Sequence, residues 1–164
     1  MRVTTTAQRP DSSIARELID ELDAVFAPNY PPESRHGYSV DKLLREDVAF
    51  FVVWVDDVPA GCGGVQGFAE GYAELKRMYV RPAFRGRGLG RHLVDYLSGH
   101  AADRGATVIR LRTGVLQVEA IGLYTSMGFR MIPPFGPYRE DAVAFCLERR
   151  LSVVNDLPVR AAGA

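Results

Sequence analysis

The sequence is poor in the residues that would assign it to several large protein classes. It has two cysteines, one tryptophan and three histidines among 164 residues. The two thiols, Cys62 and Cys146, lie far apart and do not make a disulfide framework, so we expect both to be reduced fillers of the core. His92 and His100 fall on a predicted surface helix with no other ligand clustered beside them. We therefore expect no metal site.

The chain also lacks a long apolar run and an excess of either charge. Its longest apolar run, Val48 to Val55, is far short of the roughly 20 residues that cross a bilayer. The segment Met1 to Thr6 has no apolar core of the kind found in signal peptides. The formal net charge is +0, so no overall field favours a nucleic acid or an anionic membrane. We expect a cytoplasmic protein whose partners include neither.

The composition is that of a globular domain, with 47% hydrophobic and 24% charged residues. The length suits one well-buried domain, which we assign to residues 1–151, followed by a C-terminal tail over 152–164. Hydrophobic periodicity predicts the elements of this domain. The predicted strands are 2–8, 48–55, 60–68, 73–80, 107–113, 129–132 and 142–148, and the predicted helices are 14–26, 40–44, 89–101 and 117–127.

This order of elements predicts an α/β (α+β) fold with a mixed, mostly antiparallel central sheet of about seven strands and helices on both faces. The turn Asp56-Asp57 joins two strands as an antiparallel hairpin, which excludes a pure doubly wound sheet. The second strand of this hairpin is rich in glycine, which predicts a bulge or a close approach of another backbone.

One stretch, Tyr72 to Ala101, combines a strand, a glycine-arginine turn and a helix. The N-terminus of a helix leaves N–H groups unpaired and carries about half a positive charge, so it stabilises phosphate oxygens. Glycines at 86, 88 and 90 permit positive φ and keep Cβ atoms away, and arginines at 85, 87 and 91 add charged donors. This stretch predicts a site for a small polyanionic ligand.

The turn Arg85-Gly86-Arg87-Gly88-Leu89-Gly90 resembles the Gln/Arg-x-x-Gly-x-Gly/Ala signature of the GCN5-related N-acetyltransferases (GNAT). Tyr79-Val80-Arg81-Pro82 before it, and the segment from Ala120 to Phe129, are similar to further parts of that family. The resemblance extends over roughly residues 14–151. It implies the GNAT fold, in which two central strands splay apart.

The resemblance implies acetyl-CoA, or coenzyme A, as the co-substrate. The turn would hold the pyrophosphate through backbone N–H groups, and Val80 would bond the pantetheine arm as if it were a further strand. Gln117 stands where many relatives have asparagine, which would lengthen or remove one contact to the pantetheine. The implied cofactor-binding residues are Met78, Tyr79, Val80, Arg85, Gly86, Arg87, Gly88, Leu89, Gly90, Arg91 and Gln117.

The resemblance also implies two catalytic residues for direct attack of an amine in a ternary complex. Glu74 would be the general base, acting through water, and Tyr124 the general acid that protonates the leaving thiolate. Met78 N–H would polarise the thioester carbonyl. From the residues alone, Glu74 could instead form an ion pair with Lys76 or an arginine, and Tyr124 could be a core tyrosine.

The sequence does not identify the acceptor, since a small amine, an amino acid, an antibiotic or a protein lysine all fit. Candidate substrate-binding residues are His36 and Tyr38, in a proline-rich loop, and Phe135 and Tyr138, in a second one. A packed turn or a homodimer contact would explain Phe135 and Tyr138 equally well.

Two rival functions are a non-catalytic acyl-CoA-binding sensor and a nucleotide-phosphate loop of a kinase or NTPase. The kinase or NTPase function requires a Gly-Lys-Ser/Thr ending of the loop, and this turn lacks that ending.

Overall fold

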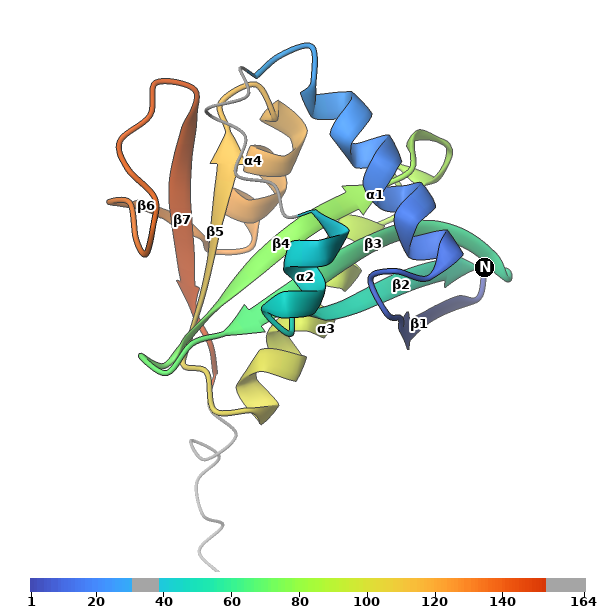
Figure 1. The fold of residues 1–164 in the computed structure, drawn as a ribbon, viewed down its shortest axis with the longest axis horizontal. Helices are drawn as coiled ribbons and strands as arrows, with labels where there is room; N and C mark the ends of the chain where they lie inside the picture. The colour runs from blue at the N-terminus through green and yellow to red at the C-terminus, as the bar shows by residue number, and fades with distance from the viewer. Residues whose placement is uncertain (31–38, 153–164) are drawn as a thin grey trace, which may run out of the picture.

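The computed structural model describes residues 1–30 and 39–152. Candidate residues His36 and Tyr38 lie outside this part of the chain. The described residues form one sheet of seven strands in the order β1-β2-β3-β4-β5-β7-β6, as Figure 1 shows. The strands are β1 (Val3–Ala7), β2 (Ala49–Val55), β3 (Val58–Gly67), β4 (Tyr72–Val80), β5 (Val108–Gly114), β6 (Arg130–Ile132) and β7 (Ala144–Arg150). The helices are α1 (Ser13–Phe26), α2 (Val40–Arg45), α3 (Leu89–Asp103), α4 (Val118–Ser126) and the short 3-10 helix η2 (Pro82–Phe84).

The predicted fold class is confirmed, because the sheet is mixed and all its described pairs except β4–β5 are antiparallel. Strand β7 begins two residues later than predicted. The Asp141 side chain accepts a hydrogen bond from Val143 N–H at 2.9 Å, and this turn delays the start of the strand to Ala144. The 3-10 helix η2 was not predicted. It begins at Pro82, whose fixed φ suits the first position of a helix.

Helices cover both faces of the sheet (Figure 1). On one face, Leu18 and Leu22 of α1 and Leu43 of α2 pack against β2 and β3. On the other, Val94 and Leu97 of α3 pack against β4 and β5 together with residues of α4. Ser12 begins α1 by accepting a hydrogen bond from Ala15 N–H at 3.2 Å. None of the helices in the described residues is long and apolar enough to span a membrane.

Strands β4 and β5 pair over only a short stretch, Tyr72 to Glu74 against Val108 to Arg110. Beyond that stretch the two strands separate, and none of the described strands pairs with the edge of β4 that faces β5. Arg81 N–H bonds to Ala60 C=O across the β3–β4 pair at 2.8 Å, so the N–H of the preceding residue, Val80, points away from β3. The predicted splay is confirmed.

A bulge interrupts β4 shortly after the point at which β4 and β5 separate. The register with β3 shifts between Cys62 and Gly64, and Arg77 takes a φ of 56°. A Cβ atom on Gly63 would lie 2.5 Å from Met78 Sδ, which explains why glycine stands opposite the bulge. The bulge directs Arg77 toward α1, where it donates to Ile19 C=O at 3.3 Å and pairs with Asp23, whereas Met78 packs on the α3 side.

Candidate active site

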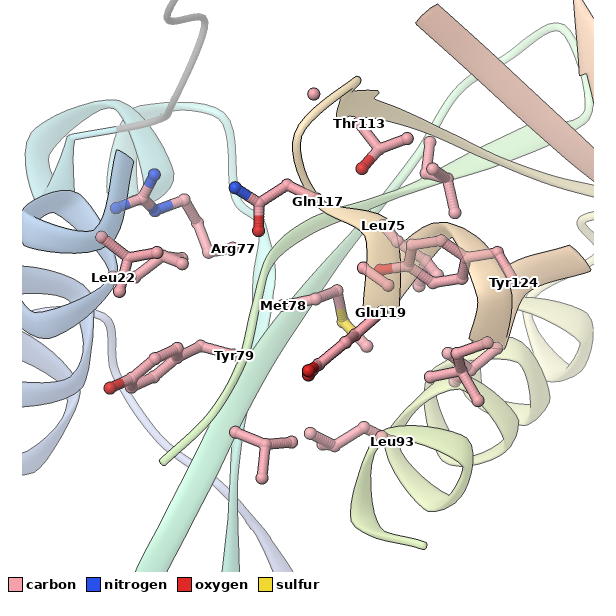
Figure 2. Close-up of a pocket in the computed structure, with 18 of the residues that line it drawn as sticks. Leu22, Leu75, Arg77, Met78, Tyr79, Leu93, Thr113, Gln117, Glu119 and Tyr124 are labelled. Carbon is pink, nitrogen blue, oxygen red and sulfur yellow. The ribbon is translucent and has the colours of Figure 1, made fainter. Parts of the chain in front are cut away.

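A cavity of about 1090 Å³ lies along the splay. Its walls come from the end of α1, the outer half of β4, the turn before α3, the end of β5 and the start of α4. In Figure 2, Leu22, Arg77 and Tyr79 lie on one side of this cavity and Tyr124 lies on the other, with Met78 and the Glu119 carboxylate between them. The cavity therefore connects the glycine-arginine turn with Glu74 and Lys76 on β4.

The turn before α3 supplies backbone donors at one end of the cavity. Gly86 and Gly88 have φ of 78° and 79°, and Gly88 is the N-cap residue of α3 with no side-chain cap. The first described hydrogen bond of α3 joins His92 N–H to Gly88 C=O at 3.0 Å, so the N–H groups before it point outward. Our prediction of a positive φ was wrong for Gly90, because this residue lies inside α3. A Cβ atom there would come 2.9 Å from Leu123 Cδ2, so Gly90 allows α3 and α4 to pack closely.

The three arginines of this turn are not equivalent. Arg85 donates from Nε to Val80 C=O at 3.1 Å, and Arg91 donates to Ser126 Oγ at 3.0 Å; both line the cavity. The Arg87 guanidinium lies over the ring of Phe84, 5.4 Å from its centre, and its side chain is not among those lining the cavity. Arg87 can thus offer a ligand its backbone, while Arg85 and Arg91 can also offer charged donors.

The remaining cofactor candidates are held by neighbouring elements. The Tyr79 hydroxyl donates to Glu21 of α1 at 3.1 Å, and burial raises the pKa of Tyr79. Gln117 is the N-cap residue of α4, and it faces the cavity across from Arg77 (Figure 2). Gln117, Met78, Tyr79 and Val80 all line the cavity.

At the other end of the cavity, Glu74 is buried at 3% exposure and bound through both carboxylate oxygens. Lys76 Nζ lies 3.1 Å from Oε1, and the Tyr138 hydroxyl donates to Oε2 at 2.5 Å. The ion pair with Lys76 is the alternative that the sequence left open, and Glu74, Lys76 and Tyr138 all line the cavity. Burial lowers the pKa of Lys76, and the Glu74 carboxylate opposes this effect.

Arg112 of β5 lies beside this group. It pairs with Asp141 at 2.9 Å, and its guanidinium is 5.6 Å from the centre of the Tyr138 ring. Phe135 packs edge-on against Tyr138 and Tyr72 but does not line the cavity. Of the two predicted residues in this connection, the structure therefore brings Tyr138 to the site and makes Phe135 a support beneath it.

Tyr124 of α4 lies between the two ends of the cavity, near Leu75 in Figure 2. Its ring packs edge-on against Phe129, and burial raises the pKa of its hydroxyl to about 12. The phenol therefore stays protonated over the whole range in which enzymes are assayed. Tyr124 both belongs to the core and lines the cavity, so the core position predicted as an alternative does not exclude a general-acid role.

Tyr30, Lys76 and Arg112 are among the cavity residues that were not predicted as site residues. Tyr30, just after α1, accepts a hydrogen bond from Leu116 N–H at 3.0 Å, and Gly114 leaves room for its ring. Lys76 shares a strand face with Glu74, and Arg112 shares one with Arg110. Charged residues at every second position of otherwise apolar strands were a signal that could have identified Lys76 and Arg112.

The sequence profile described as the "Acetyltransferase (GNAT) family" matches residues 14–129, the part of the chain that carries the splay, the turn and α4. The chain belongs to the GNAT family. This confirms the resemblance and makes the protein an acyltransferase enzyme.

Individual GNAT relatives agree with this assignment. The chain is 36% identical to an IAA acetyltransferase of Azospirillum brasilense over 91% of this chain and 98% of that protein. A solved Klebsiella pneumoniae structure assigned as an acyl-CoA N-acyltransferase has a TM-score of 0.77 and 30% identity, covering 92% of this chain and 98% of its own. The PaiA N-acetyltransferase of Thermoplasma acidophilum, solved in complex with coenzyme A, has a TM-score of 0.71 at 19% identity and covers 92% and 99% of the two chains. This last likeness is one of fold.

Proposed function

We propose that this GNAT protein transfers an acetyl group from acetyl-CoA to a primary amine by direct attack in a ternary complex. The observation that carries the proposal is the cavity itself. It runs from an uncapped helix N-terminus, which suits a pyrophosphate, to a buried carboxylate, which suits an amine.

The residues at the turn fit coenzyme A. The N–H groups from Gly86 to Arg91 and the Arg85 and Arg91 side chains would hold the pyrophosphate, because they combine a helix dipole with charged donors. The outward N–H of Val80 would pair with an amide of the pantetheine arm, as a neighbouring strand would. Acetyl-CoA supplies the thioester carbonyl that the amine attacks.

Two proton transfers complete the reaction. Glu74 would accept the proton that the nitrogen loses as its bond to the carbonyl carbon forms. Tyr124 would donate its proton to the departing thiolate, and a phenol whose pKa is raised to about 12 remains protonated and ready to do so. Met78 N–H, beside the bulge, would stabilise the charge on the thioester oxygen.

The test is an acceptor screen that measures thiol release from acetyl-CoA with a broad panel of primary amines, alongside calorimetry of coenzyme A binding. Amine-dependent thiol release together with an acetylated product in mass spectra supports the proposal. Binding of acetyl-CoA with no thiol released by any amine would favour the sensor, and tighter binding of ATP than of coenzyme A would favour the nucleotide site.

A further inference from the structure

We infer that Tyr138 takes the proton from the attacking amine and passes its own proton to Glu74, while Lys76 holds the Glu74 carboxylate in place. The inference rests on the proposed function. It gives Tyr138 a catalytic role and makes Lys76 a positioning residue.

The contacts of Glu74 carry this inference. Lys76 Nζ lies 3.1 Å from one carboxylate oxygen, and the Tyr138 hydroxyl donates to the other at 2.5 Å. Glu74 itself is only 3% exposed. A carboxylate engaged on both oxygens is reached most directly through one of its partners. Lys76 carries a positive charge and repels an ammonium, so the neutral phenol is the partner suited to receive a proton.

The position of Tyr138 also suits a residue that faces substrate. It lines the same cavity as Glu74, and its ring is fixed by edge-on packing against Phe135 at 5.3 Å. The Arg112 guanidinium lies 5.6 Å from the centre of the ring. A positive charge there stabilises the negative charge that the phenol acquires as its proton leaves.

A purely structural role explains this arrangement less well. Burying a charged pair is costly, and apolar residues of similar volume often serve a core equally well or better. Glu74 and Lys76 are buried and line the cavity, and buried titratable groups in a cleft are typical of functional sites. Among the residues that the structure describes, other charged or titratable groups also face this unit: Lys42 of α2 and Glu46 just after it, Tyr72 of β4, Arg110 and Arg112 of β5, Asp141 before β7 and Cys146 in β7.

The step balances without another reactant. The amine nitrogen bonds to the carbonyl carbon of the thioester, and the carbonyl electron pair moves onto oxygen. The nitrogen loses a proton to the Tyr138 oxygen as the Tyr138 proton moves to Glu74. The carbonyl then re-forms as the C–S bond breaks, and Tyr124 protonates the sulfur. Afterwards Glu74 returns its proton through Tyr138 to solvent, and Tyr124 regains one, which restores the enzyme.

A double-mutant cycle tests the relay. Wild type, Glu74→Gln, Tyr138→Phe and the double variant are assayed by thiol release across pH, with the most active primary amine of the panel held at a fixed concentration of its unprotonated form. The relay predicts that each single variant loses about 100-fold in kcat and that the double variant loses no more. The relay also predicts that the wild-type rate falls toward acidic pH, and that this fall is absent from the two single variants and the double variant. The KM for acetyl-CoA is the same in all of them. Tyr72→Phe is the matched control, since Tyr72 packs against Phe135 in the same cluster without bonding to Glu74.

Three results would overturn the relay. In the first, Tyr138→Phe is as fast as wild type. In the second, the losses in kcat of the two single variants multiply in the double variant. In the third, Tyr138→Phe is slower than wild type but its rate still falls toward acidic pH. The last result would mean that Tyr138 only orients Glu74. Unchanged thermal midpoints and coenzyme A binding establish that each variant is folded. If wild type binds coenzyme A but releases no thiol with any amine, the proposed function fails first, and the relay fails with it.

The role of Lys76 has its own readout. Lys76→Met removes a cation that favours the ionised carboxylate, so the acidic fall in rate moves to higher pH, and Lys76→Arg restores it. A variant that is merely less stable, with the pH profile unmoved, would contradict the positioning role.

Discussion

The two ends of the cavity are built in different ways. At the end where we propose that coenzyme A binds, the cofactor end, one continuous segment from β4 through the turn into α3 presents backbone N–H groups and two arginines. At the end where we propose that the amine binds, the acceptor end, side chains meet from parts of the chain far apart in sequence, such as Glu74 and Tyr138, which are 64 residues apart. Under the proposed function, backbone geometry therefore holds the acetyl donor, and side chains select the acceptor.

The sharpest way to separate the two ends is Tyr124→Phe, at the point between them. We expect kcat to fall about 100-fold while coenzyme A affinity stays within about twofold, because the hydroxyl is needed only when the thiolate leaves. Steady-state kinetics with an identified acceptor, and calorimetry of coenzyme A binding, measure the two quantities. A loss of affinity as large as the loss of rate would show that Tyr124 belongs to the cofactor end.

The raised pKa of Tyr124 predicts how kcat and stability depend on pH. A phenol with its pKa raised to about 12 is protonated below that pH, so Tyr124 alone causes no loss of kcat between pH 7 and about pH 10. The folded state binds this proton more tightly than the unfolded state does, so its stabilising effect is full below about pH 10 and is lost as pH rises through about 12. Alkaline unfolding, compared between wild type and Tyr124→Phe, measures this effect.

Gly88→Val breaks the cofactor end alone. Gly88 has a φ of 79°, and a branched side chain there strains the backbone even though no atom lies within 4 Å of the new Cβ. We expect coenzyme A affinity to fall about 30-fold in calorimetry. Gly99→Ala in α3 is the matched control: it also has open space around it but ordinary helical geometry, so affinity is retained and the thermal midpoint rises. Equal affinities for the two variants would contradict the backbone cradle.

A smaller effect distinguishes the arginines of the turn. Arg91→Ala removes a donor that lines the cavity, so we expect about fivefold weaker coenzyme A binding, with the difference shrinking at high salt. Arg87→Ala removes a side chain that lies over Phe84, and we expect about twofold or less. The reverse order would mean that Arg87 turns toward the ligand when coenzyme A binds.

The sequence predicted strand β4, the glycine turn and the start of α3 well because their signal is local. Glycines and arginines at fixed spacing before an amphipathic helix identify a helix N-terminus, and hydrophobic periodicity predicted the succession of strands and helices along the chain. Sequence spacing could not separate Gly88, which takes a positive φ, from Gly90, which is small in order to pack against Leu123. Nor could it show that Arg87 turns outward while Arg91 turns in.

The acceptor end was predicted less completely because its contacts are not local. The order of residues does not reveal that Tyr138 reaches Glu74 or that Tyr30 packs beside Gly114. The first contact depends on how the connection before β7 folds back over β4, and the second on how the end of α1 meets the end of β5. The ion pair of Glu74 with Lys76 was among the alternatives, since residues two apart on a strand share a face.

The most direct test of the account is a crystal structure of the protein with coenzyme A. We predict that the pyrophosphate accepts hydrogen bonds from N–H groups between Gly86 and Arg91, and that the pantetheine runs along Val80 through the splay. The thiol would lie beside the Tyr124 hydroxyl, facing Glu74 and Tyr138. A coenzyme A molecule bound elsewhere, with its pyrophosphate away from the N-terminus of α3, would contradict the account.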